Sequence, residues 1–295
     1  MNKMKFVNWY QKKWLALLGL AFFVSCTDSS MTERAVTGKL DGVEYQVSWR
    51  ATKHNLNEYQ MDTRITAIIS HIVTQFSVDN MDSEVSRLNR WPVNESFVLT
   101  RELEELFQHG LVAHEISDGR VQVFSPEADD LNRLFALDNH VVVKHDEEFE
   151  VNLSALLDGY IADRISELFR LLQVTDYQIE VNGATRLRVS GRQQQRHQFP
   201  VEVNDQAVLV SMPYNQDKAF GLASYAQTPD NSTQVVLIFH ETASVAHAVS
   251  TTLVIEEAPE IIKFVEQDAI ATLVIFNEKG EEKRYTSGLF RRFLS

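Results

Sequence analysis

Five short apolar segments follow one another between residues 177 and 239, and they constrain the fold more than any other feature of this chain. Their sequences are YQIEV, TRLRV, FPVEV, AVLVSM and TQVVLIF, each of strand-like length and rich in β-branched residues. An alternating segment at 42–50 predicts another strand, and 269–286 predicts a closing hairpin that turns at Lys279-Gly280. Helical patterns lie before and after the strand run, which predicts the α+β class. We expect one compact domain of mixed sheets and packed helices.

Five further stretches have apolar residues at helical spacing. They cover residues 61–76, 101–116, 154–172, 244–252 and 259–266. Thr100 is expected to cap the second of these helices and Ser154 the third. Gly159 lies inside the third, where glycine costs about 1 kcal/mol relative to alanine. Some close contact, such as the approach of a ligand, should therefore favour a bare backbone at this position.

The first 25 residues have the pattern of an export signal rather than of a folded segment. Four lysines accompany an apolar run at 14–24, which is too short to cross a bilayer as a helix. The run ends at Cys26, the only cysteine, and a small residue directly before such a cysteine is typical of a bacterial lipoprotein signal. We expect lipidation at Cys26, a tether over 26–36 and a folded domain over 37–295. An ordinary signal peptide with an incidental cysteine and an uncleaved anchor are the alternatives.

Lipidation at Cys26 would hold the mature chain on a membrane, facing the periplasm, without deciding between the inner and the outer membrane. Loss of the four signal lysines would change the formal charge from −13 to −17 (−13 − 4). So acidic a chain is not expected to dock on nucleic acid or on anionic lipid. Generic motifs assign no reaction, because the sequence has no Walker loop, GxGxxG, GxSxG or HExxH, and its catalytic residues stay unknown.

Six blocks of the sequence, in order, resemble motifs of one family, the ApbE proteins or FAD:protein FMN transferases. The blocks are GKLDGVEYQVSW (38–49), DSEVSRLNR (82–90), SDGRVQV (117–123), NLSALLDGYIAD (152–163), EVNGATRLRVSG (180–191) and AHAVSTTL (246–253). The resemblance implies an ApbE-like domain and the Mg²⁺-dependent transfer of FMN from FAD to a Ser or Thr of an exported protein. It also implies exported subunits of membrane redox complexes as partners.

The resemblance places two groups of site residues in this chain. The implied cofactor-binding positions are Asp158, Gly159 and Gly183, and the implied metal positions are Leu157, His247 and Thr251. Asp158 stands where the family has a lysine, and His247 where it has a magnesium-binding aspartate. Magnesium prefers oxygen ligands, so a neutral imidazole is a poor substitute. Asp158 would add negative charge beside the FAD pyrophosphate.

Other departures from the family pattern surround these positions. Asn152, Leu157, Asn182 and Ala184 replace family residues, and the family hairpin H-x-I-D-P, expected before residue 233, is missing. The positions that match are largely those that shape the fold: Ser86, Arg87, Asn89, Gly159, Tyr160, Asp163, Gly183 and Arg186. This pattern is typical of a protein that has kept the fold of its family after the active site has decayed.

Three functions follow as hypotheses. The first is a flavin transferase with a substantially altered active site, and the second is a catalytically degenerate, membrane-tethered binding or scaffolding lipoprotein with the same fold. The third is rewired chemistry, in which His247 recruits another metal or acts as a base beside Asp158. The plain structural alternatives are a helix-face histidine bonded to a neighbour and an exposed acid in the first turn of a helix.

Overall fold

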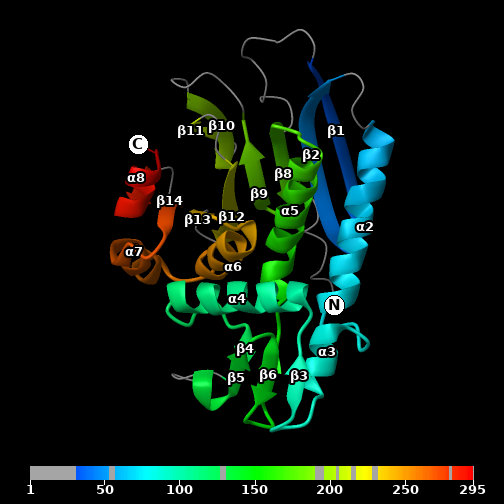
Figure 1. Ribbon diagram of the computed structural model, residues 1–295. Helices are drawn as coiled ribbons and strands as arrows, with labels where there is room; N and C mark the ends of the chain where they lie inside the picture. Colours follow the sequence, from blue (N-terminus) through cyan, green and yellow to red (C-terminus); the bar gives the residue numbers. More distant parts are fainter. Residues whose placement is uncertain are drawn as a thin grey trace, which may run out of the picture.

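The computed structural model describes residues 31–52, 57–126, 131–189, 196–203, 206–213, 217–227, 232–278 and 281–294. Its centre is an eight-stranded sheet in the order β1-β2-β8-β9-β12-β13-β14-β15, with every neighbouring pair antiparallel (Figure 1). The strands are β1 Met31–Leu40, β2 Val43–Thr52, β8 Asp176–Val181, β9 Ala184–Arg188, β12 Asp217–Gln227, β13 Ser232–His240, β14 Ala271–Glu278 and β15 Glu281–Thr286.

Helices pack over one face of this sheet (Figure 1). They are α2 Glu58–Phe76, α5 Ser154–Leu171 and α6 Ala243–Leu253, and α7 Ala258–Gln267 shares their hydrophobic core. The alternation in β2 turns Tyr45, Val47 and Trp49 toward this core, where all three are buried. The helices contribute matching apolar stripes, such as Ile65 and Ile72 of α2.

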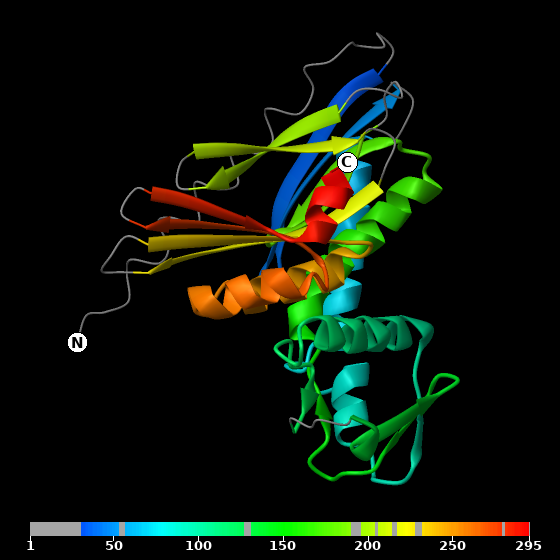
Figure 2. The same cartoon turned by 90° about the vertical axis from the view of Figure 1, so that its left-hand side faces the viewer.

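The stretch of chain that connects α2 to α5 forms a small lobe, which lies below the large sheet in Figure 2. It contains α3 Glu84–Asn89, β3 Ser96–Val98, α4 Arg101–Ile116, β4 Phe124–Ser125, the 3-10 helix η1 Leu131–Arg133, β5 Phe135–Asp138, β6 Val141–Lys144 and β7 Glu150–Val151. Two small sheets form there, in the orders β3-β6-β5 and β4-β7. Contacts among Phe107, Phe124, Phe135 and Phe149 fill the lobe's interior. These rings belong to the same continuous core as α5 and α6, so the lobe is part of one domain.

The opposite face of the large sheet has a smaller core of its own. It includes Leu187, Phe220, Phe239 and Phe290, the last from α8 Gly288–Leu294. The hairpin of β10 Arg196–Val203 and β11 Gln206–Pro213 forms a separate two-stranded sheet, and β11 contacts α8. None of the helices described here has the length and apolarity needed to cross a bilayer.

The predicted α+β class is confirmed, with helices and antiparallel sheets in one compact domain. The five strands of the apolar run are β8, β9, β10, β11 and β13, and the five predicted helices are α2, α4, α5, α6 and α7. Thr100 caps α4 as expected, because its hydroxyl accepts a hydrogen bond from the Leu103 N–H at 3.2 Å. Cys26 and the predicted turn at Lys279-Gly280 lie outside the described residues.

Three details of the sequence-based prediction are wrong. Residues 31–36, assigned to the tether, form the first half of β1 and pair with β2, because backbone pairing does not need an apolar sequence. Ser154 does not cap α5; the Asn152 side chain instead accepts a hydrogen bond from the Ser154 N–H at 3.1 Å. Strand β12 is absent from the prediction, since Ala219 and Gly221 give it little apolar bulk.

Candidate functional site

Asp158, Asn182, Gly183 and His247 come together from three elements, and we call them the Asp158 cluster. Asp158 lies in α5, Asn182 and Gly183 form the turn between β8 and β9, and His247 lies in α6. The Asn182 side-chain amide donates a hydrogen bond to Asp158 Oδ1 at 3.0 Å. His247 Nε2 lies 3.8 Å from Asp158 Oδ2. The two chain positions that depart most sharply from the family pattern therefore face each other.

The turn that carries Asn182 and Gly183 requires its residue types. Gly183 has a φ of +93°, a conformation that side chains rarely allow, and Asn182 adopts the left-handed region at +45°. A Cβ added to Gly183 would lie 2.8 Å from the Leu222 carbonyl oxygen and 3.8 Å from His247 Cε1. The turn therefore packs closely against both β12 and α6.

Gly159 is explained by the contact between α5 and α6. A Cβ at this position would lie 2.3 Å from the Ala243 carbonyl oxygen and 2.3 Å from Ser244 Cα. Both are backbone atoms, so α6 makes a close approach here that the sequence did not predict and that favours a bare backbone. Helix packing alone accounts for this glycine, and its assignment to a cofactor stays a prediction.

Burial perturbs both ionisable groups of the Asp158 cluster. It raises the pKa of Asp158 to about 6, although the hydrogen bond from Asn182 opposes the change. It lowers the pKa of His247 to about 4. At neutral pH the imidazole is uncharged and the carboxylate is largely ionised, so the 3.8 Å approach is not an ion pair. His247 Nδ1 is buried and has no hydrogen-bond partner in the described part of the chain.

The implied metal positions do not assemble a magnesium site in this geometry. Thr251 Oγ1 donates a hydrogen bond to the His247 carbonyl oxygen at 2.8 Å, within its own helix. At the Leu157 position the resemblance implies a backbone oxygen as the ligand, and the half-buried Leu157 side chain packs against the hydrophobic core. Across the described ranges, no three His, Cys, Asp or Glu side chains converge to hold a metal ion. A single carboxylate beside a neutral imidazole does not fit Mg²⁺, which takes oxygen ligands.

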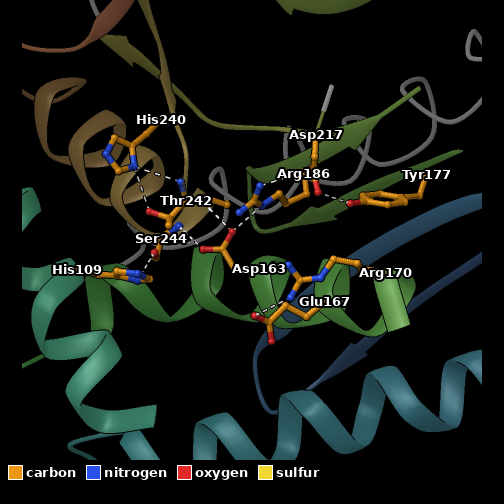
Figure 3. A network of polar contacts seen from close by, with 11 residues as sticks. His109, Asp163, Glu167, Arg170, Tyr177, Arg186, Asp217, His240, Thr242 and Ser244 are labelled. Carbon is orange, nitrogen blue, oxygen red and sulfur yellow. Dashed lines mark hydrogen bonds and ion pairs between the residues drawn. The ribbon is translucent and has the colours of Figure 1, made fainter. Parts of the chain in front are cut away.

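A second polar network joins α5, α6 and the sheet (Figure 3). The buried carboxylate of Asp163 accepts hydrogen bonds from Arg186 Nε at 2.7 Å and from the N–H groups of Ala243 and Ser244 at 2.8 and 3.1 Å. It thereby satisfies free N–H groups at the start of α6, where the helix dipole favours a negative charge. Asp217 receives a further hydrogen bond from Arg186 at 3.3 Å. Asp163 and Arg186, which are among the positions that match the family pattern, thus connect α5, α6 and the sheet.

Two histidines lie beside this network, His109 on α4 of the small lobe and His240 at the end of β13 (Figure 3). His109 Nδ1 lies 2.8 Å from the hydroxyl oxygen of Ser244, and His240 Nδ1 lies 3.1 Å from that of Thr242. Burial lowers the pKa of both imidazoles. Sequence reasoning missed His109 and Ser244, because they are 135 residues apart and match no motif. Ser244 is fully buried, so the pair links α4 to α6 and offers no nucleophile to a substrate.

The kept positions of the small lobe also have structural partners. Asn89 pairs with the Val151 backbone through two hydrogen bonds, at 2.9 and 2.8 Å. Ser86 Oγ donates to the Val78 carbonyl oxygen at 3.2 Å. These contacts fix α3 against β7 and the chain that leads into it. They agree with the prediction that the residues retained from the family pattern shape the fold.

Comparisons with known proteins point to one group. No family model matches the chain. The FAD:protein FMN transferase of Vibrio cholerae serotype O1 is 20% identical to it over 332 residues, covering 96% of this chain and 99% of that protein.

Solved structures give the same result for the fold. The flavin transferase ApbE from Vibrio cholerae is 18% identical with a TM-score of 0.67, covering 90% of this chain and 100% of that one. The flavinyl transferase ApbE from Pseudomonas stutzeri, in its apo form, is 16% identical with a TM-score of 0.71. The match covers 90% of this chain and 97% of that one. The ApbE protein from Thermotoga maritima is 15% identical with a TM-score of 0.61, covering 90% and 100%. These findings show that the chain has the fold of the ApbE flavin transferases, and that it is similar to an FAD:protein FMN transferase over nearly its whole length.

Proposed function

We propose that this protein is a membrane-tethered lipoprotein that uses the flavin transferase fold for binding or scaffolding and has lost Mg²⁺-dependent FMN transfer. The observation that carries this proposal is the Asp158 cluster. In it, Asp158 is held by Asn182 and faces a buried, neutral His247. Asp158 stands where the family resemblance implies a lysine, and His247 stands where it implies an aspartate.

Electrostatics supports the loss of transfer. FMN transfer from FAD develops negative charge on phosphate oxygens, and such reactions depend on cations that neutralise it. The Asp158 carboxylate has the opposite effect, since two negative charges about 4 Å apart repel by roughly 1 kcal/mol in water and about 4 kcal/mol near a protein surface. We therefore expect weak binding of the FAD pyrophosphate at this position.

FMN transfer by an altered site is the second candidate. It is supported by the similarity to an FAD:protein FMN transferase over nearly the whole chain. The Asp158 carboxyl, whose pKa is raised to about 6, would suit a general base for an acceptor hydroxyl. Exported subunits of membrane redox complexes would then be the acceptors. His247 is a weaker candidate for the base, because its imidazole is buried and its pKa is lowered to about 4.

The proposed place of action is the periplasmic side of a membrane, with a lipid on Cys26 as the anchor. Support comes from the lysines, the short apolar run and the lone cysteine of the first 26 residues. The protein partners would be membrane-associated and are identified only by this location.

Isothermal titration of FAD into the soluble form Thr27–Ser295, with and without Mg²⁺, tests the proposal. We expect no magnesium-dependent binding in the parent protein. The double variant Asp158→Lys with His247→Asp should gain FAD affinity, because it restores a cation and a hard ligand. Glu147→Lys, a charge reversal at an exposed loop residue, is the matched control and should gain nothing.

Magnesium-dependent FAD binding by the parent, followed by FMN transfer to a Ser/Thr acceptor peptide, would refute the degenerate function and favour the second candidate. Failure of the double variant to gain affinity would show that no FAD pocket survives around the Asp158 cluster.

A further inference from the structure

One end of the molecule carries two large apolar side chains in water. Tyr59, in the first turn of α2, is 80% exposed, and Leu171, the last residue of α5, is 78% exposed. The two helices pack against each other and run in opposite directions, since Phe76 at the end of α2 contacts Tyr160 near the start of α5. Both exposed residues therefore lie at the same end of the helix pair, the upper end in Figure 1.

The start of β1 belongs to this same end. Met31 pairs with Thr52 at the end of β2, the strand that precedes α2. An ion pair of 2.9 Å between Arg34 and Glu58 joins β1 to the first turn of α2. The chain thus enters the fold beside Tyr59.

The chain between the predicted lipid and the fold is short. Met31 lies five positions after Cys26 (31 − 26), and five residue-to-residue steps span at most about 17 Å even when fully extended. A lipid on Cys26 would therefore hold the end that contains Met31 close to the membrane surface. The small lobe, at the opposite end of α2, would point away from it (Figure 1).

We propose that this end, defined by Met31, Tyr59 and Leu171, docks on the lipid bilayer and fixes the orientation of the anchored protein. The proposal rests on the lipid anchor of the proposed function. Tyrosine is favoured at membrane interfaces, where its ring meets the acyl region and its hydroxyl stays hydrated. Leu171 would insert beside it. Arg170, whose side chain is 67% exposed, lies next to Leu171 and is paired with Glu167 at 3.6 Å, so the positive charge beside Leu171 is balanced by a carboxylate.

This orientation sets the distance between the Asp158 cluster and the membrane surface. Leu171 lies thirteen positions after Asp158 in α5 (171 − 158), which corresponds to about 20 Å along the helix axis. The cluster and the small lobe would face the aqueous side, within reach of a periplasmic protein segment and out of reach of lipid headgroups.

Site-specific fluorescence on the lipidated, full-length protein tests the orientation. Cys26 is the only cysteine and its thiol would be consumed by the lipid, so an introduced cysteine becomes the single labelling site. Tyr59→Cys and Leu171→Cys place an environment-sensitive fluorophore at the docking end. Val98→Cys is the matched control, because Val98 is similarly exposed but lies in the small lobe. Vesicles of phosphatidylethanolamine with a minority of phosphatidylglycerol carry a spin-labelled lipid as quencher.

The floated, vesicle-bound protein should lose most of its fluorescence when the label is at 59 or 171, and little when it is at 98. Quenching at 98 as strong as at 59 and 171, or no quenching at any of the three, would overturn the orientation. Flotation itself reports on the anchor: full-length protein should float and Cys26→Ser should not. Full-length protein that fails to float would overturn both the anchor and the docking. FAD binding does not enter this readout, so an active transferase would leave the result unchanged.

Discussion

Replacing Gly159 by alanine tests whether packing between α5 and α6 explains this glycine. The new Cβ would lie 2.3 Å from both the Ala243 carbonyl oxygen and Ser244 Cα. Inside a helix, alanine is ordinarily more stable than glycine by about 0.5–1 kcal/mol. Because backbone atoms cannot rotate away, we expect overpacking to outweigh that gain and to lower the free energy of unfolding by on the order of 2 kcal/mol.

Urea unfolding of the soluble form, followed by far-ultraviolet circular dichroism, measures this change without any ligand. Gly110→Ala is the matched control in α4, where the nearest atom to the added Cβ is a side-chain carbon, Val123 Cγ2, at 3.0 Å. That side chain can shift, so the control should change stability by less than about 1 kcal/mol. A Gly159→Ala protein as stable as its parent would refute the packing explanation and return the glycine to a ligand-binding role.

Two further predictions concern the polar networks. Asp163→Ala leaves Arg186 and two N–H groups of α6 without their carboxylate. The substitution should lower the free energy of unfolding, measured with urea, by about 3 kcal/mol. A loss below about 1 kcal/mol would contradict this role of Asp163. The folded-state pKa of Asp158 is raised to about 6, so its contribution favours folding at low pH and is lost as pH rises from about 4 to about 6. Asp158→Asn should therefore match its parent near pH 4 and be more stable by on the order of 1–3 kcal/mol above pH 6. Because both proteins contain His247, comparing them at each pH cancels its opposite contribution to stability. The same difference in free energy of unfolding near pH 4 and above about pH 6 would contradict the raised pKa of Asp158.

The sequence was most informative where an element has a periodic apolar pattern. In β2, Tyr45, Val47 and Trp49 alternate with more polar neighbours and are buried. Thr100 offers a cap and is one, because capping depends only on residues three positions apart. Patterns of this kind are local, so they can be read along the chain.

Elements that depend on distant partners escaped the prediction. Strand β12 lies in the middle of the large sheet, yet its inward positions include Ala219 and Gly221, because the backbone of α6 passes directly over it. A Cβ on Gly221 would lie 2.3 Å from the Ala246 carbonyl oxygen. Small residues that permit close approach look like a loop in the sequence and become a central strand only when α6 is in place.

The amino-acid sequence was enough to predict the class of the fold, most of the helices and strands, and the family resemblance, because apolar periodicity and short motifs are local properties. It also identified Asp158 and His247 as the sharpest departures from that family. The contacts between those residues depend on how the elements pack and could not be predicted from the sequence. Asp158, Asn182 and His247 come from α5, a turn of the sheet and α6, and their 3.0 and 3.8 Å contacts, their burial and their shifted pKa values exist only once these elements pack together.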